Sequence, residues 1–291
     1  MDNLEKENIR TELLKYCERY RDASNPQDTG QNKAAASLKD VSGATLSQMI
    51  SRKWDLISDK MWRNVSLQIS KNTKWKAVET TDFKQIRKIL TDAKDNSLVM
   101  AITGGAGSGK TFALTHFAET NKQVYLLSCN EYWNRKLFLS ELLTKLGKDN
   151  SGTVGEMMTI AVNALRNPVG SLLILDEADK LSDQVLYFFI TMYNQLEDEC
   201  GIVLCATSFL EKRLKRGIKL NKKGYNEIWS RLGRKCIELK GVTAKDIVDI
   251  CSENDITEKK TLDMIISDSE GDLRRVKRKI HALAKKQLKT A

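Results

Sequence analysis

The sequence has little proline and histidine and no long apolar run. Its 291 residues include 2 prolines and 2 histidines. Because proline interrupts helices, its scarcity favours a chain rich in helix. His116 and His281 lie far apart in the sequence, which argues against a zinc site built on paired histidines. No apolar run approaches the roughly 20 residues that a membrane-spanning helix needs, so we expect no membrane partner.

The cysteines and the first residues indicate the compartment. The six cysteines form no C-x-x-C pair, and most lie in apolar segments, which is typical of reduced, buried cysteines in the cytosol. The first ten residues, MDNLEKENIR, are charged throughout and are unlike a signal peptide. We therefore expect a cytoplasmic protein. Its length allows about two domains of roughly 100–200 residues each.

The net charge of +10 is unevenly distributed. With Lys and Arg counted against Asp and Glu, residues 1–76 carry +4, residues 77–207 carry −4 and residues 208–291 carry +10. Two basic flanks around an acidic middle favour a polyanionic partner beyond a nucleotide, most simply nucleic acid. A basic face that serves only solubility is the alternative that composition leaves open.

The stretch ITGGAGSGKT, residues 102–111, matches the phosphate-loop pattern G-x-x-x-x-G-K-[ST] without a mismatch. An apolar, β-rich run precedes it and a helical pattern follows it, as the motif requires. Glycines let successive N–H groups face one anion at a helix N-terminus. Lys110 would reach the β- and γ-phosphates of ATP, and the Thr111 hydroxyl would hold Mg²⁺. The predicted phosphate-binding residues are Gly104, Gly105, Ala106, Gly107, Ser108, Gly109, Lys110 and Thr111.

The stretch SLLILDEADKL, residues 171–181, predicts the second half of the same site. Four apolar residues, typical of a buried parallel strand, end in the carboxylates Asp176 and Glu177. Asp176 would join the Mg²⁺ shell beside the nucleotide, and Glu177 would act as the general base on the attacking water. The alternative is that the two carboxylates are only surface charge at the end of a strand. The phosphate loop upstream makes this alternative much weaker.

Three later stretches complete the predicted nucleotide site. The apolar run GIVLCATS ends in Thr207 and Ser208, either of which could orient the attacking water. In EIWSRLGRK, Arg231 is the preferred candidate to stabilise phosphoryl charge in a neighbouring subunit, and Arg234 is the reserve. Arg274 in SEGDLRRVKRK lies in the first turn of a helix and could reach back to the γ-phosphate. A structural pairing of either Arg231 or Arg234 with a helix carboxylate remains an alternative.

The pattern from about residue 81 onward alternates between strand and helix. Such alternation predicts an α/β fold in which helices cover both faces of a parallel sheet. The strands that we expect are residues 98–103, 123–128, 171–175, 201–206 and 235–239.

The N-terminal region predicts a small, all-α helix-turn-helix domain. Residues 32–54 read as two short helices with a turn at Ser42-Gly43, where Val41 and Leu46 would close the angle between them. This segment resembles the helix-turn-helix of the Cro/repressor type, and residues 57–70 read as a closing helix. A helical hairpin that serves only packing is the alternative. The candidate DNA-binding residues on the polar face of the second helix are Thr45, Ser47, Gln48, Ser51 and Arg52.

A run of cations follows the fourth predicted strand. Seven of the twelve residues 212–223 are Lys or Arg, which suits several phosphate contacts and salt-sensitive, sequence-tolerant DNA binding. A solvated charge run is the alternative. The predicted DNA-binding residues here are Lys212, Arg213, Lys215, Arg216 and Lys219.

Taken in order, these motifs resemble those of an AAA+ ATPase over about residues 77–291. Residues 104–111 match the family's Walker A motif, and LLILDEAD matches its Walker B motif. Thr207 or Ser208 matches sensor 1, Ser230-Arg231 the arginine finger and residues 271–274 sensor 2. The resemblance implies a P-loop AAA+ sheet with a C-terminal helical lid. The expected domains are a helix-turn-helix domain at 1–70, a linker at 71–82, an ATPase core at 83–241 and a lid at 242–291.

The helix-turn-helix before the ATPase narrows the resemblance to the phage Mu B group of transposition proteins. That resemblance implies ATP and Mg²⁺ as cofactors, duplex DNA and a transposase as partners, and an ATP-dependent helical filament or ring of identical subunits. ATP hydrolysis, stimulated by DNA and the transposase, would disassemble the filament. Two alternatives stay open: an AAA+ helicase loader of the DnaC/IstB kind, and a transcription regulator in which ATP controls an operator-binding domain.

Overall fold

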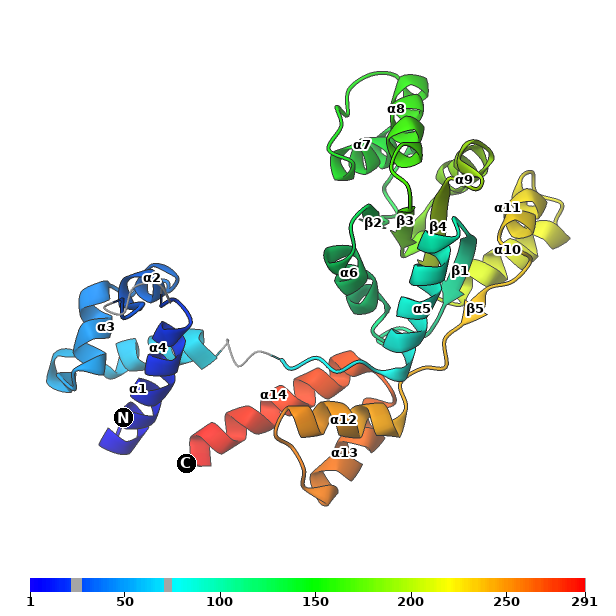
Figure 1. The fold of residues 1–291 in the computed structure, drawn as a ribbon. Helices are drawn as coiled ribbons and strands as arrows, with labels where there is room; N and C mark the ends of the chain where they lie inside the picture. Colours follow the sequence, from blue (N-terminus) through cyan, green and yellow to red (C-terminus); the bar gives the residue numbers. More distant parts are fainter. Residues whose placement is uncertain (22–27, 71–74, 291) are drawn as a thin grey trace. The chain divides into compact units, whose positions relative to one another are not determined.

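The computed structural model describes residues 1–21, 28–70 and 75–290 (Figure 1). The chain divides into two compact units, one of residues 1–76 and 283–291 and the other of residues 77–282. The predicted linker, residues 71–82, crosses this division, and its residues 71–74 lie outside the described residues. Each unit is therefore described by itself.

The first unit is helical. It contains α1 (Asn3–Glu18), α2 (Gln31–Ala36), α3 (Gly43–Ile50), the 3-10 turn η1 (Trp54–Leu56) and α4 (Asp59–Ser70). A capping box between Asp2 and Glu5 begins α1, where each residue's side chain accepts a hydrogen bond from the other's backbone N–H. One apolar core joins the helices, and its fully buried members include Leu13, Leu46, Met49, Trp62 and Val65.

The two short helices of the predicted helix-turn-helix are present, and Val41 and Leu46 are both buried in the core between them. The predicted turn at Ser42-Gly43 is wrong. The Ser42 hydroxyl accepts a hydrogen bond from the backbone N–H of Thr45 at 3.1 Å, so Ser42 caps α3 and Gly43 is its first residue. The connection is residues 37–42 instead. The second helix also ends early, at Ile50, and left-handed backbone at Arg52 (φ 63°) separates it from η1.

The second unit is built on a five-stranded parallel sheet. Its strands are β1 (Val99–Thr103), β2 (Val124–Ser128), β3 (Ser171–Asp176), β4 (Cys200–Ala206) and β5 (Ile237–Glu238), in the order β2-β3-β4-β1-β5. Each strand lies within two residues of its predicted range. Every residue of the central strands β3 and β4 is buried, which explains their continuous apolar sequences.

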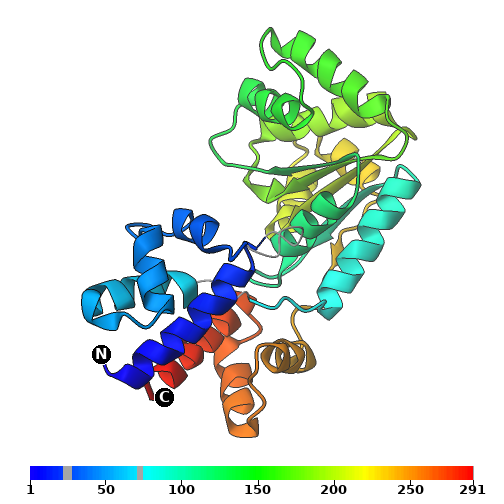
Figure 2. The ribbon, with the colours of Figure 1, turned by 60° about the vertical axis from the view of Figure 1, so that its left-hand side comes forward.

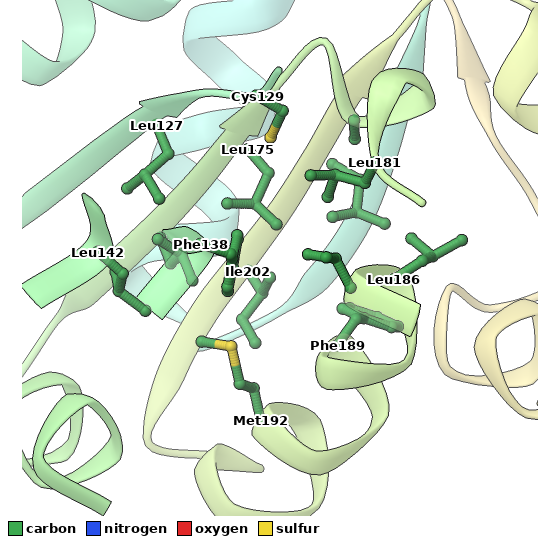
Figure 3. Close-up of a cluster of buried hydrophobic side chains, with 14 of the residues drawn as sticks. Leu127, Cys129, Phe138, Leu142, Leu175, Leu181, Leu186, Phe189, Met192 and Ile202 are labelled. Carbon is green, nitrogen blue, oxygen red and sulfur yellow. The ribbon is translucent and has the colours of Figure 1, made fainter. Parts of the chain in front are cut away.

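Helices cover both faces of this sheet, because alternate residues of a strand point to opposite sides. Leu172 and Ile174 of β3 pack with α5 (Thr81–Asp95) and α6 (Lys110–Thr120). Leu173 and Leu175 belong to the larger cluster on the other face. Figure 3 shows Leu175 in this cluster together with Phe138 of α7. This second face is covered by α7 (Arg135–Lys145), α8 (Val154–Arg166), α9 (Asp183–Leu196), α10 (Phe209–Lys219) and α11 (Tyr225–Arg231). Figure 2 shows α5 (cyan) on a different side from α7 and α8 (green).

Three helices follow the sheet, as the predicted lid requires. They are α12 (Ala244–Glu253), α13 (Lys259–Ser269) and α14 (Leu273–Thr290). Asp246, in the first turn of α12, accepts hydrogen bonds from the backbone N–H groups of Thr81 (2.8 Å) and Thr243 (2.9 Å), which fixes α12 to the start of α5. The structure therefore confirms the predicted fold class, a parallel α/β sheet followed by helices and preceded by a helical region. Within the described residues, no helix is long and apolar enough to cross a membrane.

Candidate functional site

The phosphate loop joins β1 to α6 at the carboxyl end of the sheet. Gly107 (φ 76°) and Gly109 (φ 90°) both have left-handed backbone, which glycine adopts without the Cβ clash that other residues meet. The buried Ser108 hydroxyl donates to the carbonyl of Gly105 at 3.0 Å and holds the loop closed. The loop therefore ends at the N-terminus of α6, where free N–H groups favour an anion.

The Lys110 side chain folds back over this loop. Its Nζ donates to the carbonyl oxygens of Gly104 (2.9 Å) and Gly105 (2.7 Å). Charge-assisted hydrogen bonds to phosphate are stronger than those to neutral carbonyls, so a nucleotide would displace these contacts. The loop and its lysine together fit a triphosphate.

Two oxygen ligands for a hard cation lie at one point beside the loop. The Thr111 hydroxyl at the start of α6 donates to Oδ2 of Asp176 at 2.7 Å. Asp176 ends β3 and is 2% exposed, and burial raises the pKa of its carboxyl, against the opposing effect of the Thr111 hydrogen bond. Hydroxyl and carboxylate oxygens are ligands that Mg²⁺ prefers, so this pair fits a nucleotide-bound Mg²⁺.

Glu177 follows Asp176 directly and has left-handed backbone (φ 56°). Its N–H donates to Oδ1 of Asp176 at 2.9 Å, and its own Oε2 accepts a hydrogen bond from Lys180 Nζ at 2.7 Å. The Glu177 hydrogen bond raises the pKa of Lys180. In this structure the predicted base is thus paired with a lysine three residues later. Sequence reasoning missed Lys180, although the i, i+3 spacing in DEADK was a signal for such a pair.

Thr207 and Ser208 follow β4, which lies next to β3 in the sheet. The Thr207 hydroxyl donates to Oδ2 of Asp179 at 2.5 Å. Ser208 is exposed at the start of α10. Of the two predicted water-orienting residues, Thr207 is therefore the one held against the segment that follows Glu177.

The start of α14 lies directly on the phosphate loop. The backbone N–H of Leu273 donates to the carbonyl of Gly107 at 3.0 Å. A Cβ added at Gly107 would lie 2.2 Å from Oδ1 of Asp272, so any other residue there would displace the Asp272 side chain. The predicted sensor residue Arg274 is exposed in the first turn of α14, one residue after this contact. Sequence reasoning placed Arg274 near the nucleotide but missed the contact that Asp272 and Leu273 make.

Arg231 lies apart from these residues, at the end of α11. Its Nε and Nη2 donate to Oδ1 of Asn194 at 3.1 and 2.8 Å, and its guanidinium lies 5.4 Å from the ring centroid of Tyr193. It also pairs with Glu227 at 3.4 Å. The reserve candidate Arg234 is exposed, with left-handed backbone (φ 55°). These contacts of Arg231 are with α9 and α11 of its own subunit, and its predicted role in a neighbouring subunit stays a prediction.

The predicted DNA-binding residues of α10 divide into two kinds. Four of the side chains are exposed: Lys212, Lys215, Arg216 and Lys219. The fifth, Arg213, has a side chain only 16% exposed and donates its hydrogen bonds to groups of the same unit. The exposed four remain the candidates for phosphate contacts.

The predicted DNA-binding face of α3 is partly exposed. Ser47 is exposed, and Thr45 and Gln48 are half-buried, while Ser51 and Arg52 are exposed just after the helix ends. Arg52 forms an ion pair with Glu7 of α1 at 2.8 Å, and the Thr45 hydroxyl lies 2.9 Å from the Ser42 hydroxyl. These five residues stay a prediction for DNA contact.

Comparison with known proteins found similarity to one domain family and to one phage protein. Residues 93–214 match the family described as AAA domain. The chain is also 29% identical over 162 residues to the Mu-like prophage FluMu DNA transposition protein B of Haemophilus influenzae. These two matches support an AAA+ ATPase of the Mu B type. The alignment covers 54% of this chain and 54% of the relative, so the Mu B-type similarity spans about half the length of that protein.

Two solved structures are similar over part of their length. Cdc6p from Pyrobaculum aerophilum has a TM-score of 0.45 and 20% identity, over 62% of this chain and 51% of that one. The Drosophila ORC bound to DNA has a TM-score of 0.47 and 15% identity, over 67% of this chain and 52% of that one. At these values, neither similarity assigns a role to any residue of this chain.

Proposed function

We propose that this Mu B-type protein is an ATPase that assembles on duplex DNA and activates a transposase. The observation that carries the proposal is the constellation of Lys110, Thr111, Asp176 and Glu177 around one helix N-terminus. The relative named as a DNA transposition protein supports the transposase as partner. We also infer a cytoplasmic location.

The proposed hydrolysis uses the chain's own residues as follows. The loop N–H groups and Lys110 would bind and orient the phosphates, and Thr111 and Asp176 would hold Mg²⁺. When bound, that ion would neutralise charge that develops on the phosphates. Once the Glu177 carboxylate has separated from Lys180, it accepts the proton of the attacking water. Thr207 orients that water. Arg274 contacts the γ-phosphate from the lid side.

The proposed assembly places Arg231 at the nucleotide of a neighbouring subunit. An arginine supplied in trans can stabilise phosphoryl transfer, and such an arrangement makes hydrolysis depend on assembly. ATP would thus join subunits into a filament or ring on DNA. Duplex DNA and the transposase would stimulate hydrolysis, and hydrolysis would release the subunits. The exposed cations of α10 would repeat along that assembly and contact the DNA backbone, which gives strong, salt-sensitive binding with little sequence preference.

Two variants test this proposal by electron microscopy of protein on long duplex DNA. Glu177→Gln keeps the shape of the side chain but removes the base, so we expect it to bind ATP and persist on DNA. Lys110→Ala removes the phosphate contact, so we expect it to lose ATP binding and DNA coating. Normal coating by Lys110→Ala would contradict ATP-gated assembly. A preference for single strands would favour a helicase loader, and a defined footprint would favour a transcription regulator.

A further inference from the structure

Arg213 differs from the other cations of α10 in what its guanidinium contacts. Its Nη1 donates to the carbonyl oxygens of Leu181 (2.6 Å) and Asp179 (3.2 Å). Its Nη2 donates to Oδ1 of Asp183, and its Nε donates to the Tyr225 hydroxyl at 3.3 Å. All three nitrogens of the guanidinium are therefore used within the unit, which a surface phosphate ligand would not require.

Three of these acceptors belong to one short stretch of chain. Residues 177–183, here called the post-β3 segment, begin with the proposed base Glu177 and end at the first residue of α9. Leu181 fixes the segment in the apolar core, as Figure 3 shows, and is 2% exposed. Thr207, two residues before α10, holds Asp179 of the same segment. Both attachments come from the β4–α10 stretch of the chain.

The packing around Arg213 leaves it little freedom. A Cβ added at Gly217 of α10 would lie 2.2 Å from Cδ1 of Tyr225, so these two residues are in direct contact. The Tyr225 hydroxyl donates to Oδ1 of Asp183 at 2.7 Å, beside the Arg213 guanidinium. A displacement of α10 must therefore move Asp183 and the carbonyls of Asp179 and Leu181, or break these hydrogen bonds.

We propose that Arg213 is a positioning residue that transmits DNA binding on α10 to Glu177. DNA phosphates would pull on the exposed cations of α10, and Arg213 would carry that displacement into the post-β3 segment. The displacement would then change the shape of this segment and move Lys180 away from Glu177, which frees the base. This inference rests on the proposed function, because it explains how DNA stimulates hydrolysis.

The geometry requires arginine and not just a positive charge. A guanidinium presents donors in a fixed planar fork, whereas a lysine ammonium acts as a compact point charge. Arg213→Lys therefore separates two roles. If Arg213 binds DNA phosphate, the lysine restores stimulation, and if it holds the post-β3 segment, the lysine does not.

The test measures ATP hydrolysis with and without saturating duplex DNA, together with DNA affinity, the KM for ATP and the thermal unfolding midpoint. In Arg213→Gln and Arg213→Lys we expect the ratio of DNA-stimulated to basal kcat to fall toward unity. The KM for ATP should stay unchanged, and DNA affinity should change by no more than about threefold, because the exposed cations of α10 that contact the phosphates remain in place. The matched control is Arg216→Gln on the exposed side of α10, which should weaken DNA binding but retain the full ratio at saturation.

The possible outcomes separate this inference from the proposed function. Wild-type protein that binds duplex DNA without any rise in kcat refutes the proposed function. Wild-type stimulation that persists in Arg213→Gln, or that Arg213→Lys restores, overturns only the inference. Should Arg213→Gln fail to fold, Tyr225→Phe decides, because it keeps the ring against Gly217 and removes one hydroxyl from the network. We expect Tyr225→Phe to lower the ratio, and an unchanged ratio would overturn the inference.

Discussion

Lys180→Met should raise the basal rate of ATP hydrolysis. Lys180 pairs with the proposed base Glu177 at 2.7 Å, and the two side chains are 36% and 46% exposed. Ion pairs of such exposure contribute at most about 1 kcal/mol. If hydrolysis requires this pair to open, its removal can raise kcat by up to about fivefold, since 1.4 kcal/mol corresponds to tenfold.

The assay is steady-state hydrolysis by the protein without DNA, at several salt concentrations. Salt screens an exposed pair, so basal kcat of the wild type should rise with salt while that of Lys180→Met should not. The matched control is Arg166→Met, which breaks the Arg166–Glu199 pair of similar exposure on α8 and should not change kcat. A lower kcat in Lys180→Met would refute the reasoning, because it would mean that Lys180 assists Glu177.

Three further predictions concern other parts of the second unit. Arg231→Ala should lower hydrolysis without weakening ATP binding by isolated subunits; unchanged hydrolysis in a kinetic assay would remove it from the trans role. Asp246→Asn should cost about 1–3 kcal/mol of unfolding free energy at neutral pH. Burial opposes ionisation of Asp246, but hydrogen bonds from Thr243 and Thr81 outweigh it and lower its pKa. Its contribution is therefore present above the ordinary aspartate pKa and lost as pH falls through the lowered value, so denaturant titrations of the two proteins should converge in acid. Gly107→Ala should lower the thermal midpoint and ATP affinity, because its Cβ would meet Asp272. Gly105→Ala is its stability control, since in the described part of the chain its added Cβ meets no atom within 4 Å; equal midpoints for the two variants would contradict the lid contact.

The strands and the phosphate loop were predictable because local sequence determines them. β3 and β4 are buried on both faces, so their apolar runs mark them without any knowledge of their neighbours. The turn at Ser42-Gly43 was mispredicted because glycine is frequent in turns. In the structure Ser42 caps α3, and Gly43 is the first residue of that helix. Local sequence patterns thus located most elements. They failed at Ser42-Gly43, where the turn preference of glycine competes with the helix-capping preference of serine.

The contacts around the site depend on residues far apart in the sequence. Arg213 and Asp183 are 30 positions apart, and Leu273 and Gly107 meet only when α14 packs on the loop. The charge run around Arg213 predicted a surface residue. The helical spacing could have predicted its burial, because Arg213 lies on the same face of α10 as the buried Leu210 and Gly217.

The most direct test of the central claim is ATP hydrolysis by the pure protein with and without long, non-specific duplex DNA across a salt series. The account predicts stimulation that grows with duplex length and fades as salt screens the exposed cations of α10. Hydrolysis that is indifferent to duplex DNA at every salt concentration would contradict it.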